Sequence, residues 1–309
     1  MASPTDPSGD VLRPFDRASV RRHRDRAAAK LSSHDFLLRE VGERLGERLG
    51  DIRRDFPRVL DLGAHDGAMA GYLGEAGSEL VVQCDLSPAM AAANGRAHPR
   101  LVADEEFLPF APNSFDLVVS NLSLHWVNDL PGALAQARRA LKPDGFFLGA
   151  LLGGDSLFEL RRCLMDAELR IEGGVSPRVS PMADVRDAGN LLTRAGFAIP
   201  VSDSDTITVS YASAFDLMRE LRGMGEGNAV AERRKGFSRR ETLLEAAAMY
   251  AREYADNDGR VTVTFQVLYL GGWTPHESQQ KPLRPGSAAA RLADALGTTE
   301  QPAGDKAEP

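Results

Sequence analysis

The stretch VLDLGAHDG, from Val59 to Gly67, decides the expected fold. An apolar run that holds one acid, Asp61, ends in a turn with two glycines four positions apart, Gly63 and Gly67. This pattern is typical of a strand that leaves a sheet and passes through a glycine turn into a helix, where the backbone can approach a ligand. Because ligands of open α/β sheets bind outside the carboxyl ends of the strands, the turn predicts a binding site.

Beyond this stretch, short apolar runs alternate with helical patterns, as expected of a parallel sheet covered by helices. The spacing of these units suits right-handed crossovers within one sheet. The segment KPDG predicts a turn that ends a helix before the next strand. The predicted strands span 58–62, 80–84, 100–103, 115–120 and 145–152, the predicted helices span 67–76, 88–97 and 130–141, and KPDG spans 142–145.

The pattern is less regular beyond residue 153. The clearest later strand, VTVTFQVLYLGGW, alternates β-branched and aromatic residues as an antiparallel edge or near-edge strand does. No linker divides the chain convincingly, so the sequence predicts one α/β domain over 51–285 with helical insertions after residue 153. The later helices are predicted at 155–171, 182–195, 213–223 and 238–256, and the later strands at 197–201, 205–211 and 261–273.

The two ends differ from this domain in composition. Residues 1–12 and 286–309 are small, polar and rich in Pro or Ala, which predicts disordered tails. Residues 13–50 form a basic and helical segment, with a helix at 32–50 that Ser32 or Ser33 can cap. The basic stretch 13–30 predicts either a docking or lid element for an acidic partner or phosphate, or a solvated helical face.

Composition excludes several classes of protein. The chain has 309 residues with 37 basic and 44 acidic side chains, a net charge of -7 that argues against a general nucleic-acid binder. Two cysteines cannot make a disulfide framework, so a reducing compartment is expected. Because no secretory signal and no apolar run of roughly 18 residues is visible, the sequence predicts a cytoplasmic protein that does not span a membrane.

A second acid sharpens the interpretation of the glycine turn. Asp85 ends the second predicted strand, 22 residues after Gly63, where a carboxylate can accept hydrogen bonds from both ribose hydroxyls of a nucleoside. The ligand would then be a dinucleotide or S-adenosylmethionine. The turn lacks the GxGxxG spacing that a pyrophosphate needs, and no GxxxxGK[ST] occurs in the chain, so S-adenosylmethionine is favoured.

This arrangement resembles the class I S-adenosylmethionine methyltransferases, whose first motif is an acid followed by GxGxG. The resemblance implies a Rossmann-like fold with a central, mostly parallel seven-stranded sheet, flanking helices and extra C-terminal helices. His65 stands where the family's middle glycine is usual, and Asp104-Glu105 matches the family's adenine-side acid. The implied contacts to S-adenosyl-L-methionine are Asp61, Gly63, Ala64, His65, Gly67, Asp85, Leu86, Asp104, Glu105 and Asn121.

The end of the fourth strand, SNLSLHWV at 120–127, would face the methyl group. His125 and Trp126 are therefore the predicted catalytic residues, with a packing pair as the alternative. The six histidines show no HxH or HExxH spacing, so no metal site is predicted. The absence of an [ND]PP[YF] or Pro-Cys element argues against nucleic-acid substrates, and Cys84 and Cys163 are interpreted as small buried residues.

The second half of the chain narrows the resemblance. Its segments resemble the methyltransferase-fold assembly factor of mitochondrial respiratory complex I, and the resemblance runs from about residue 13 to 288. It implies a protein that hydroxylates an arginine of the complex I subunit carrying an iron–sulfur cluster near the quinone site, with peripheral association at the inner membrane. The segments that carry it include 153–168, 172–197, 215–229 and 264–288.

The same framework also resembles, more loosely, the malonyl-acyl-carrier-protein methyl ester synthase of biotin synthesis. Its acceptor is a carboxylate, which needs positioning and no general base. Asp104, His125 and Trp126 would then shape the pocket. Basic residues would bind the acidic acyl carrier or the substrate carboxylate, unless they only form a solvated surface; they are Arg161, Arg162, Arg219 and Arg222. A catalytically silent, cofactor-binding assembly chaperone is the third hypothesis.

Overall fold

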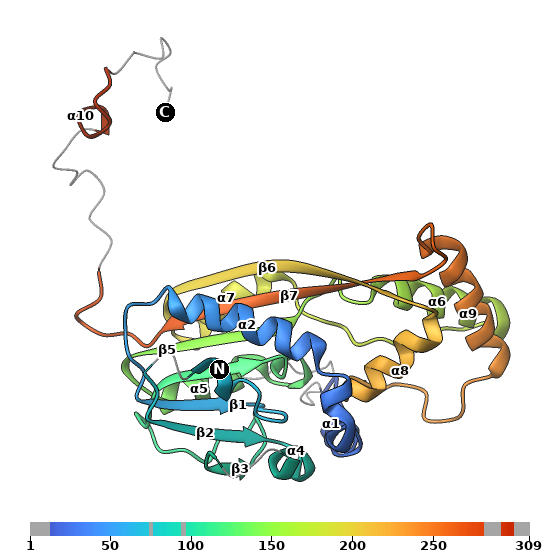
Figure 1. Cartoon of the computed structure of the whole chain (residues 1–309), viewed down its shortest axis with the longest axis horizontal. Coiled ribbons are helices and arrows are strands. Elements are labelled where there is room, and N and C mark those ends of the chain that lie inside the picture. The colour runs from blue at the N-terminus through green and yellow to red at the C-terminus, as the bar shows by residue number, and fades with distance from the viewer. Residues whose placement is uncertain (1–12, 74–76, 94–96, 281–291, 300–309) are drawn as a thin grey trace, which may run out of the picture. The chain divides into compact units, whose positions relative to one another are not determined.

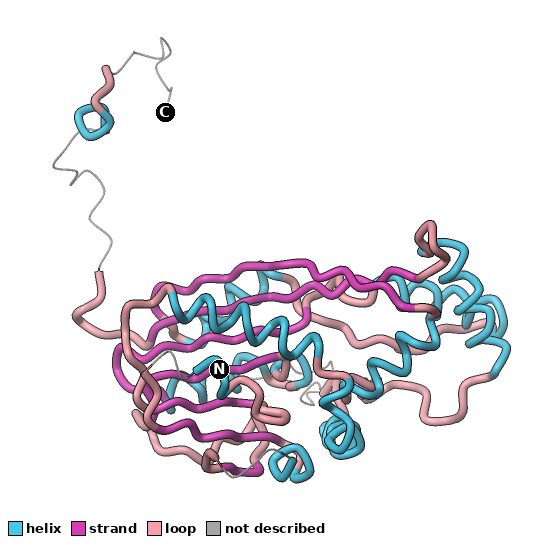
Figure 2. The backbone as a smooth tube through the Cα atoms, viewed as in Figure 1, coloured by secondary structure: helices cyan, strands magenta, loops and turns pink. Residues whose placement is uncertain are grey.

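The computed structural model describes residues 13–73, 77–93, 97–280 and 292–299 (Figures 1 and 2). The chain divides into two units, 1–275 and 276–309, and all of the site described below belongs to the first. The predicted tail 1–12 lies outside the described residues, as do 286–291 and 300–309 of the other tail. Between these last two segments the structure contains the short helix α10 (Leu292–Leu296).

A seven-stranded sheet in the order β3-β2-β1-β4-β5-β7-β6 forms the centre of the first unit. The strands β1 to β5 pair in parallel, and β7 runs antiparallel to both of its neighbours, β5 and β6. This confirms the predicted α/β class and the mostly parallel sheet. The strands are β1 (Arg58–Leu62), β2 (Leu80–Asp85), β3 (Arg100–Val102), β4 (Phe115–Asn121), β5 (Leu141–Leu152), β6 (Ala198–Tyr211) and β7 (Val261–Trp273).

Two predicted boundaries within the sheet are wrong. The turn predicted at 142–145 lies inside β5, because Leu141 already pairs with Phe115 of β4 before a register shift, and Lys142 binds Asp116 at 2.7 Å. The strands predicted at 197–201 and 205–211 are one strand, β6. Its polar residues 202–204 keep their pairing with β7, because their side chains stay exposed while the backbone hydrogen bonds continue.

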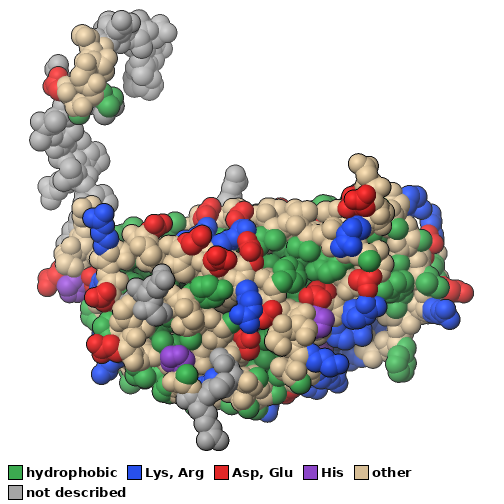
Figure 3. All heavy atoms as spheres, viewed as in Figure 1, with side chains coloured by type: hydrophobic (Ala, Val, Ile, Leu, Met, Phe, Trp, Pro, Cys, Tyr) green, Lys and Arg blue, Asp and Glu red, His purple; other side chains and the backbone are tan. Residues whose placement is uncertain are grey.

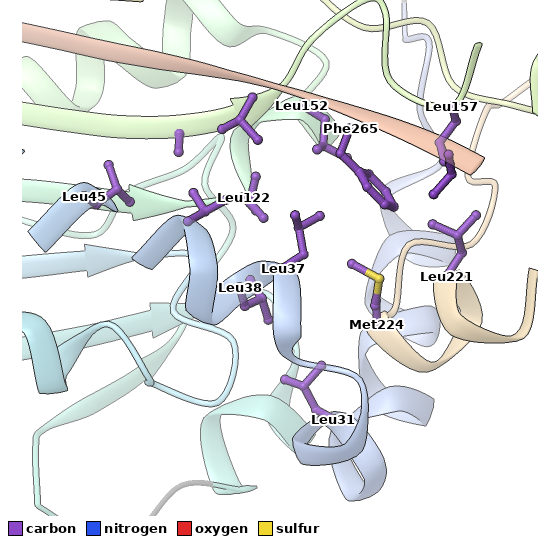
Figure 4. Packing of buried hydrophobic residues seen from close by; sticks show 14 of the residues in the cluster. Leu31, Leu37, Leu38, Leu45, Leu122, Leu152, Leu157, Leu221, Met224 and Phe265 are labelled. Carbon is purple, nitrogen blue, oxygen red and sulfur yellow. The ribbon is translucent and has the colours of Figure 1, made fainter. Parts of the chain in front are cut away.

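Helices cover both faces of the sheet and build one apolar core on each. The α2 stripe of Leu37, Val41 and Leu45 is fully buried in the first core, part of which Figure 4 shows. Cys84 and Cys163 are both buried, as predicted. The first core is covered by α2 (Phe36–Gly50), α6 (Phe158–Glu172), α8 (Ala214–Met224) and α9 (Arg240–Tyr254), and the second by α5 (Leu130–Ala140) and α7 (Val185–Ala195).

The N-terminal segment folds as α1 (Arg17–Ala27) and a 3-10 helix, η1 (Ala28–Ser33). The predicted cap of α2 by Ser32 or Ser33 is wrong. Both serines belong to η1, the turn that brings Leu31 into the apolar core (Figure 4). The N-cap residue of α2 is Asp35, which makes no side-chain capping hydrogen bond. Asp16 caps α1, because its carboxylate accepts a hydrogen bond from the Ser19 amide.

Helix α1 lies beyond the carboxyl ends of β1 and β2 (Figure 1), where it packs against α8 and the short helix α4 (Pro88–Ala93). Within the described residues, the connection from β1 to β2 contains one helix, α3 (Ala70–Leu73), and α4 lies between β2 and β3. The chain thus places a basic helix over the edge of the sheet at which the sequence predicts the ligand site.

Charges of both signs are mixed on the surface of the protein. On the face in Figure 3, Lys and Arg side chains lie among Asp and Glu side chains. None of the helices in the described part of the chain combines the length and apolar character needed to cross a membrane.

Candidate active site

The glycine turn after β1 is tied closely to β2. The amides of Gly63 and Ala64 both donate to the carbonyl of Cys84, at 2.8 and 2.9 Å. Gly63 has a φ of +70°, and a Cβ atom at this position would lie 2.0 Å from the Ser123 hydroxyl oxygen. Only glycine fits there, because the Ser123 side chain packs directly against the backbone of the turn.

Asp61 supports this turn from inside the sheet. Its side chain is fully buried and accepts a hydrogen bond from Gln83 Nε2 at 3.3 Å, and the same amide group donates to the carbonyl of Gly67 at 3.2 Å. Burial raises the pKa of Asp61 to about 7. The Asp61 carboxyl, which titrates near neutral pH, therefore positions the Gln83 amide that holds the Gly67 carbonyl of the turn.

Asp85 stands at the end of β2 and binds the next loop and the glycine turn together. Its Oδ1 accepts from the Ser87 amide at 2.7 Å, and its Oδ2 accepts from the His65 amide at 3.0 Å. A third contact comes from α1, where Arg24 Nη1 lies 3.3 Å from Oδ2. The two predicted cofactor residues His65 and Asp85 are thus brought together by the fold.

Arg24 is the unexpected centre of this region. Its side chain is 1% exposed. Nη1 donates to Glu105 at 2.9 Å, and Nη2 donates to the Ser123 hydroxyl at 2.8 Å. Burial alone would raise the pKa of Glu105, but the charges of Arg24 and Arg17 outweigh burial and hold this pKa at about 2. A buried, ionised network therefore joins α1 to the ends of β2 and β4 and to the loop after β3.

Arg17 binds the same loop from about two turns of α1 closer to the N-terminus. It donates to Asp104 at 2.6 Å, to the Trp126 carbonyl at 3.1 Å and, in a close contact, to Glu105. Arg17 and Arg24 are seven residues apart, so they lie on one face of the helix. Asp104 and Glu105, which the sequence assigns to the cofactor, are therefore both in ion pairs with α1.

Only part of the basic stretch 13–30 forms the solvated helical face, one of its two predicted alternatives, and the docking or lid element stays a prediction. Arg21 and Arg22 are exposed, as on a solvated helical face. Arg17 and Arg24 point inward, so that interpretation is wrong for them. The spacing of seven residues between Arg17 and Arg24 could have indicated that they share one face of the helix. Because basic residues also lie between them, this spacing did not stand out in the sequence.

His125 and Trp126 lie in a short 3-10 helix, η3 (Leu124–Trp126), directly after β4. Both are buried, and both meet the carboxylate of Glu226, with His125 Nε2 at 3.0 Å and Trp126 Nε1 at 2.8 Å from the same oxygen. His65 reaches the same region, where its Nε2 lies 3.2 Å from the carbonyl of Leu122. Burial lowers the pKa of His65, which favours its neutral form. No motif or spacing in the sequence singles out Glu226.

The remaining predicted contacts have different surroundings. The amide group of Asn121 donates to the Leu38 carbonyl of α2 at 2.8 Å and so faces away from the carboxylates. Leu86 is half-buried and packs against an apolar cluster that contains Phe15 and Trp126. In this cluster the ring of Phe15 is edge-on to the indole of Trp126. The structure thus brings Gly63, His65, Asp85 and Glu105 close together. Asn121 and Leu86 make their contacts outside this group.

Two cavities meet at Glu226. The larger, of about 380 Å³, lies between η3, α6 and α8, and Trp126 and Glu226 form part of its wall. The smaller, of about 10 Å³, is lined by His65, His125 and Glu226 together with apolar side chains. A third pocket, of about 860 Å³, opens beside Arg17 and Asp104. Glu226 therefore separates the glycine turn from a pocket large enough for an amino-acid side chain.

The four arginines suggested for an acyl carrier protein have unlike positions. Arg161 donates to the carbonyls of Gly154 and Ser156, and Arg219 binds Asp216 at 2.5 Å, so both serve the chain's own structure. Arg162 lies 3.9 and 4.0 Å from two acids, and Arg222 is exposed at the larger cavity. In the described part of the chain, no group of three His, Cys, Asp or Glu side chains is arranged to hold a metal ion.

A family model described as a methyltransferase domain matches residues 60–149. Among solved structures, YcgJ from Bacillus subtilis has a TM-score of 0.54 at 15% identity, with 75% of this chain and 98% of that chain covered. A Haemonchus contortus phosphoethanolamine N-methyltransferase 2, in complex with S-adenosylhomocysteine, has a TM-score of 0.52 at 17% identity over 83% and 60% of the two chains. These structures confirm the class I methyltransferase fold.

Curated relatives match nearly the whole chain. The protein named arginine-hydroxylase NDUFAF5, mitochondrial, is 46% identical in Danio rerio over 91% of this chain and 88% of that protein. The Homo sapiens protein of the same name is 46% identical over 92% and 84%. A malonyl-[acyl-carrier protein] O-methyltransferase from Halorhodospira halophila is 37% identical over 84% and 88%. The chain therefore belongs to the NDUFAF5 arginine-hydroxylase family, and is an enzyme of the class I S-adenosylmethionine-dependent methyltransferase superfamily.

Proposed function

We propose that this protein hydroxylates an arginine side chain of a partner protein, the complex I subunit that carries an iron–sulfur cluster near the quinone site, and so assists complex I assembly. The 46% identity to proteins named arginine-hydroxylase, along nine tenths of the chain, carries this proposal. The partner implies that the protein works in the cytoplasm, at the surface of the inner membrane.

S-adenosylmethionine is the cofactor of the superfamily, and the residues at the carboxyl ends of β1 and β2 fit it. Gly63, which has no Cβ atom, lets Ser123 and Glu105 lie close to the backbone of the glycine turn. Asp85 offers the carboxylate that ribose hydroxyls require. Its contact with Arg24, at 3.3 Å, is longer than the 2.9 Å contact of Arg24 with Glu105, so a hydroxyl group can replace the first contact while the second remains.

When bound, S-adenosylmethionine would supply a sulfonium whose methyl carbon is open to in-line attack, which is the chemistry of the methyl-transfer candidate below. Hydroxylation of an arginine takes its oxygen atom from a separate oxidant, dioxygen together with a reductant. The chain's own residues orient the ligands and exclude water. Asp85 and the glycine turn would hold the nucleoside, and Arg17 and Arg24 would keep α1 over it. His125 and Trp126 would face the acceptor. The further cofactor contacts in this proposal are Asp61, Ala64, His65, Gly67, Leu86, Asp104, Glu105 and Asn121.

A carboxyl O-methyltransferase acting on malonyl-acyl carrier protein, or on another small acid, is the second candidate. The 37% identity to a protein of that name supports it. So does Arg222, which is exposed at the cavity of about 380 Å³ and has no ion pair with any described residue. A guanidinium in this position can bind a carboxylate. A third candidate is a non-catalytic, cofactor-binding assembly chaperone. The buried ion pairs of Arg24 with Asp85 and Glu105 support this candidate.

Deleting the gene in its host separates the first two candidates. We expect complex I activity of isolated membranes to fall, while growth without biotin stays normal. The reason is that the proposed acceptor lies in complex I and the second candidate's acceptor lies in biotin synthesis. Complementation with the intact gene is the control. A deletion strain that requires biotin and keeps normal complex I activity would support the methyl ester synthase instead.

A further inference from the structure

Glu226 is held rigidly at the end of α8. Its amide donates to the Leu221 carbonyl at 2.8 Å, and the amide of Gly225 donates to the Arg222 carbonyl at 3.3 Å. Gly225 adopts a φ of +85°, the left-handed conformation that ends a helix in this way. These backbone hydrogen bonds fix the main chain at Glu226, from which its side chain reaches His125 and Trp126.

One carboxylate oxygen of Glu226 is fully used by the protein. It meets both His125 Nε2 and Trp126 Nε1, at 3.0 and 2.8 Å. No described residue donates a hydrogen bond to the other oxygen. The side chain is 11% exposed, and it borders the cavity of about 380 Å³. An oriented carboxylate oxygen is thus available to a group that enters this cavity.

The carboxylate is charged at neutral pH. Burial alone would raise the pKa of Glu226, but the interaction with His125 and the charge of Arg24 outweigh burial and lower this pKa. A buried carboxylate that keeps its charge attracts a cation much more strongly than it would in water. The cavity therefore has a fixed negative group in its wall.

The rest of the cavity suits a long aliphatic side chain that ends in a cation. The indole of Trp126 lines it, and an indole face attracts a guanidinium. The apolar side chains around it are Leu152, Leu157, Leu160, Leu164, Met218 and Leu221.

Arginines also line the cavity, but three of them are neutralised by the protein's own acids. Arg178 binds Glu168 at 2.6 Å, and Arg233 binds Asp16 at 2.9 Å. Arg234 pairs with Glu172. Only Arg222, among the described residues of this wall, is a cation without an ion pair, and it is exposed. These pairs leave the charge of Glu226 available in the interior.

We propose that Glu226 binds the guanidinium of the acceptor arginine through its free carboxylate oxygen, with the methylene stem of that arginine lying along the apolar wall. This inference rests on the proposed function and names the residue that selects its substrate. A malonyl carboxylate in the same place would face the charge of Glu226 across a buried space, which is unfavourable. Glu226 thus favours a cationic acceptor over an anionic one.

The test compares two peptides of the iron–sulfur subunit, one with the acceptor arginine and one with citrulline, its neutral isostere, at that position. Binding to the full chain with S-adenosylhomocysteine is measured by calorimetry. We expect the wild type to prefer arginine by about 30-fold, because a charge-assisted hydrogen bond is roughly twice as strong as a neutral one. Glu226→Gln should remove this preference, and Glu232→Gln, an exposed residue six positions further on, should keep it.

The ratio of the two affinities separates recognition from folding, because damage to the structure weakens both peptides equally. A wild type without preference for arginine overturns the inference, and so does a preference that survives in Glu226→Gln. Binding of neither peptide also counts against it. The proposed function has its own test, which is independent of this one. If the partner subunit contains no added oxygen while the arginine peptide still binds through Glu226, the proposed function is wrong and the inference about Glu226 remains.

Discussion

Arg24→Met is expected to lower the free energy of unfolding by about 3 to 5 kcal/mol at neutral pH. The variant keeps a side chain of similar length but removes the charge that Asp85 and Glu105 share in the interior. Removing one partner of a buried ion pair leaves the other charge without compensation, which costs far more than losing an exposed pair. Urea unfolding followed by circular dichroism measures the loss.

Arg21→Met on the exposed face of the same helix is the matched control. Arg21 is 52% exposed and lies 3.8 Å from Asp25, so we expect a change of no more than about 0.5 kcal/mol. Equal losses in the two variants would show that Arg24 stabilises the helix and not the buried carboxylates.

The effect of Arg24→Met should also depend on pH. In the wild type the pKa of Glu105 lies at about 2, below its ordinary value of 4.5. Its charge therefore stabilises the fold above about pH 4.5, and this contribution is lost as the pH falls toward 2. Without Arg24, only Arg17 still opposes the effect of burial, so the pKa of Glu105 is higher than in the wild type and protonation relieves the variant in acid. We expect the difference in unfolding free energy to shrink between about pH 7 and pH 4.

Asp85→Ala is expected to weaken the binding of S-adenosylmethionine by at least about 100-fold. The carboxylate is the group proposed to accept both ribose hydroxyls, and each hydrogen bond to a charged group contributes about 1.5 to 3 kcal/mol. Isothermal titration of the purified protein measures the affinity. Asp203→Ala, which removes an exposed acid on β6, should leave it unchanged.

The same variant decides between the enzyme and the assembly chaperone. If the protein acts only by binding its partner, Asp85→Ala will lose the cofactor and still restore complex I in the deletion strain. If the protein is an enzyme, a folded Asp85→Ala protein will fail to restore it. Unchanged cofactor affinity in Asp85→Ala would contradict the assignment of the ribose site.

The fold could be predicted from the sequence because its signals are local. The turn after β1 contains Gly63, Asp85 closes the next strand 22 residues later, and apolar runs mark the sheet between them. The helix α2 followed from the spacing of Leu37, Val41 and Leu45. The single strand β6 could not be predicted, because its continuity comes from pairing with β7 across polar residues.

The decisive parts of the candidate site are pairings between distant segments, which sequence spacing does not encode. Arg24 meets Asp85 and Glu105, 61 and 81 residues away. Glu226 meets Trp126 across 100 residues. From the sequence alone, both residues would be placed on the surface. Arg24 lies in a basic stretch and Glu226 lies between two glycines, and charged residues in such segments are usually exposed to water. Only the fold turns them inward.

Mass spectrometry of the complex I iron–sulfur subunit, purified from wild-type and deletion strains, shows whether an arginine of this subunit is hydroxylated. The proposed function predicts that one arginine of the wild-type subunit carries the mass of one added oxygen atom, and that this addition is absent in the deletion strain and returns on complementation. An added methyl group in its place, or an arginine that is unmodified in the wild type, would contradict the proposal.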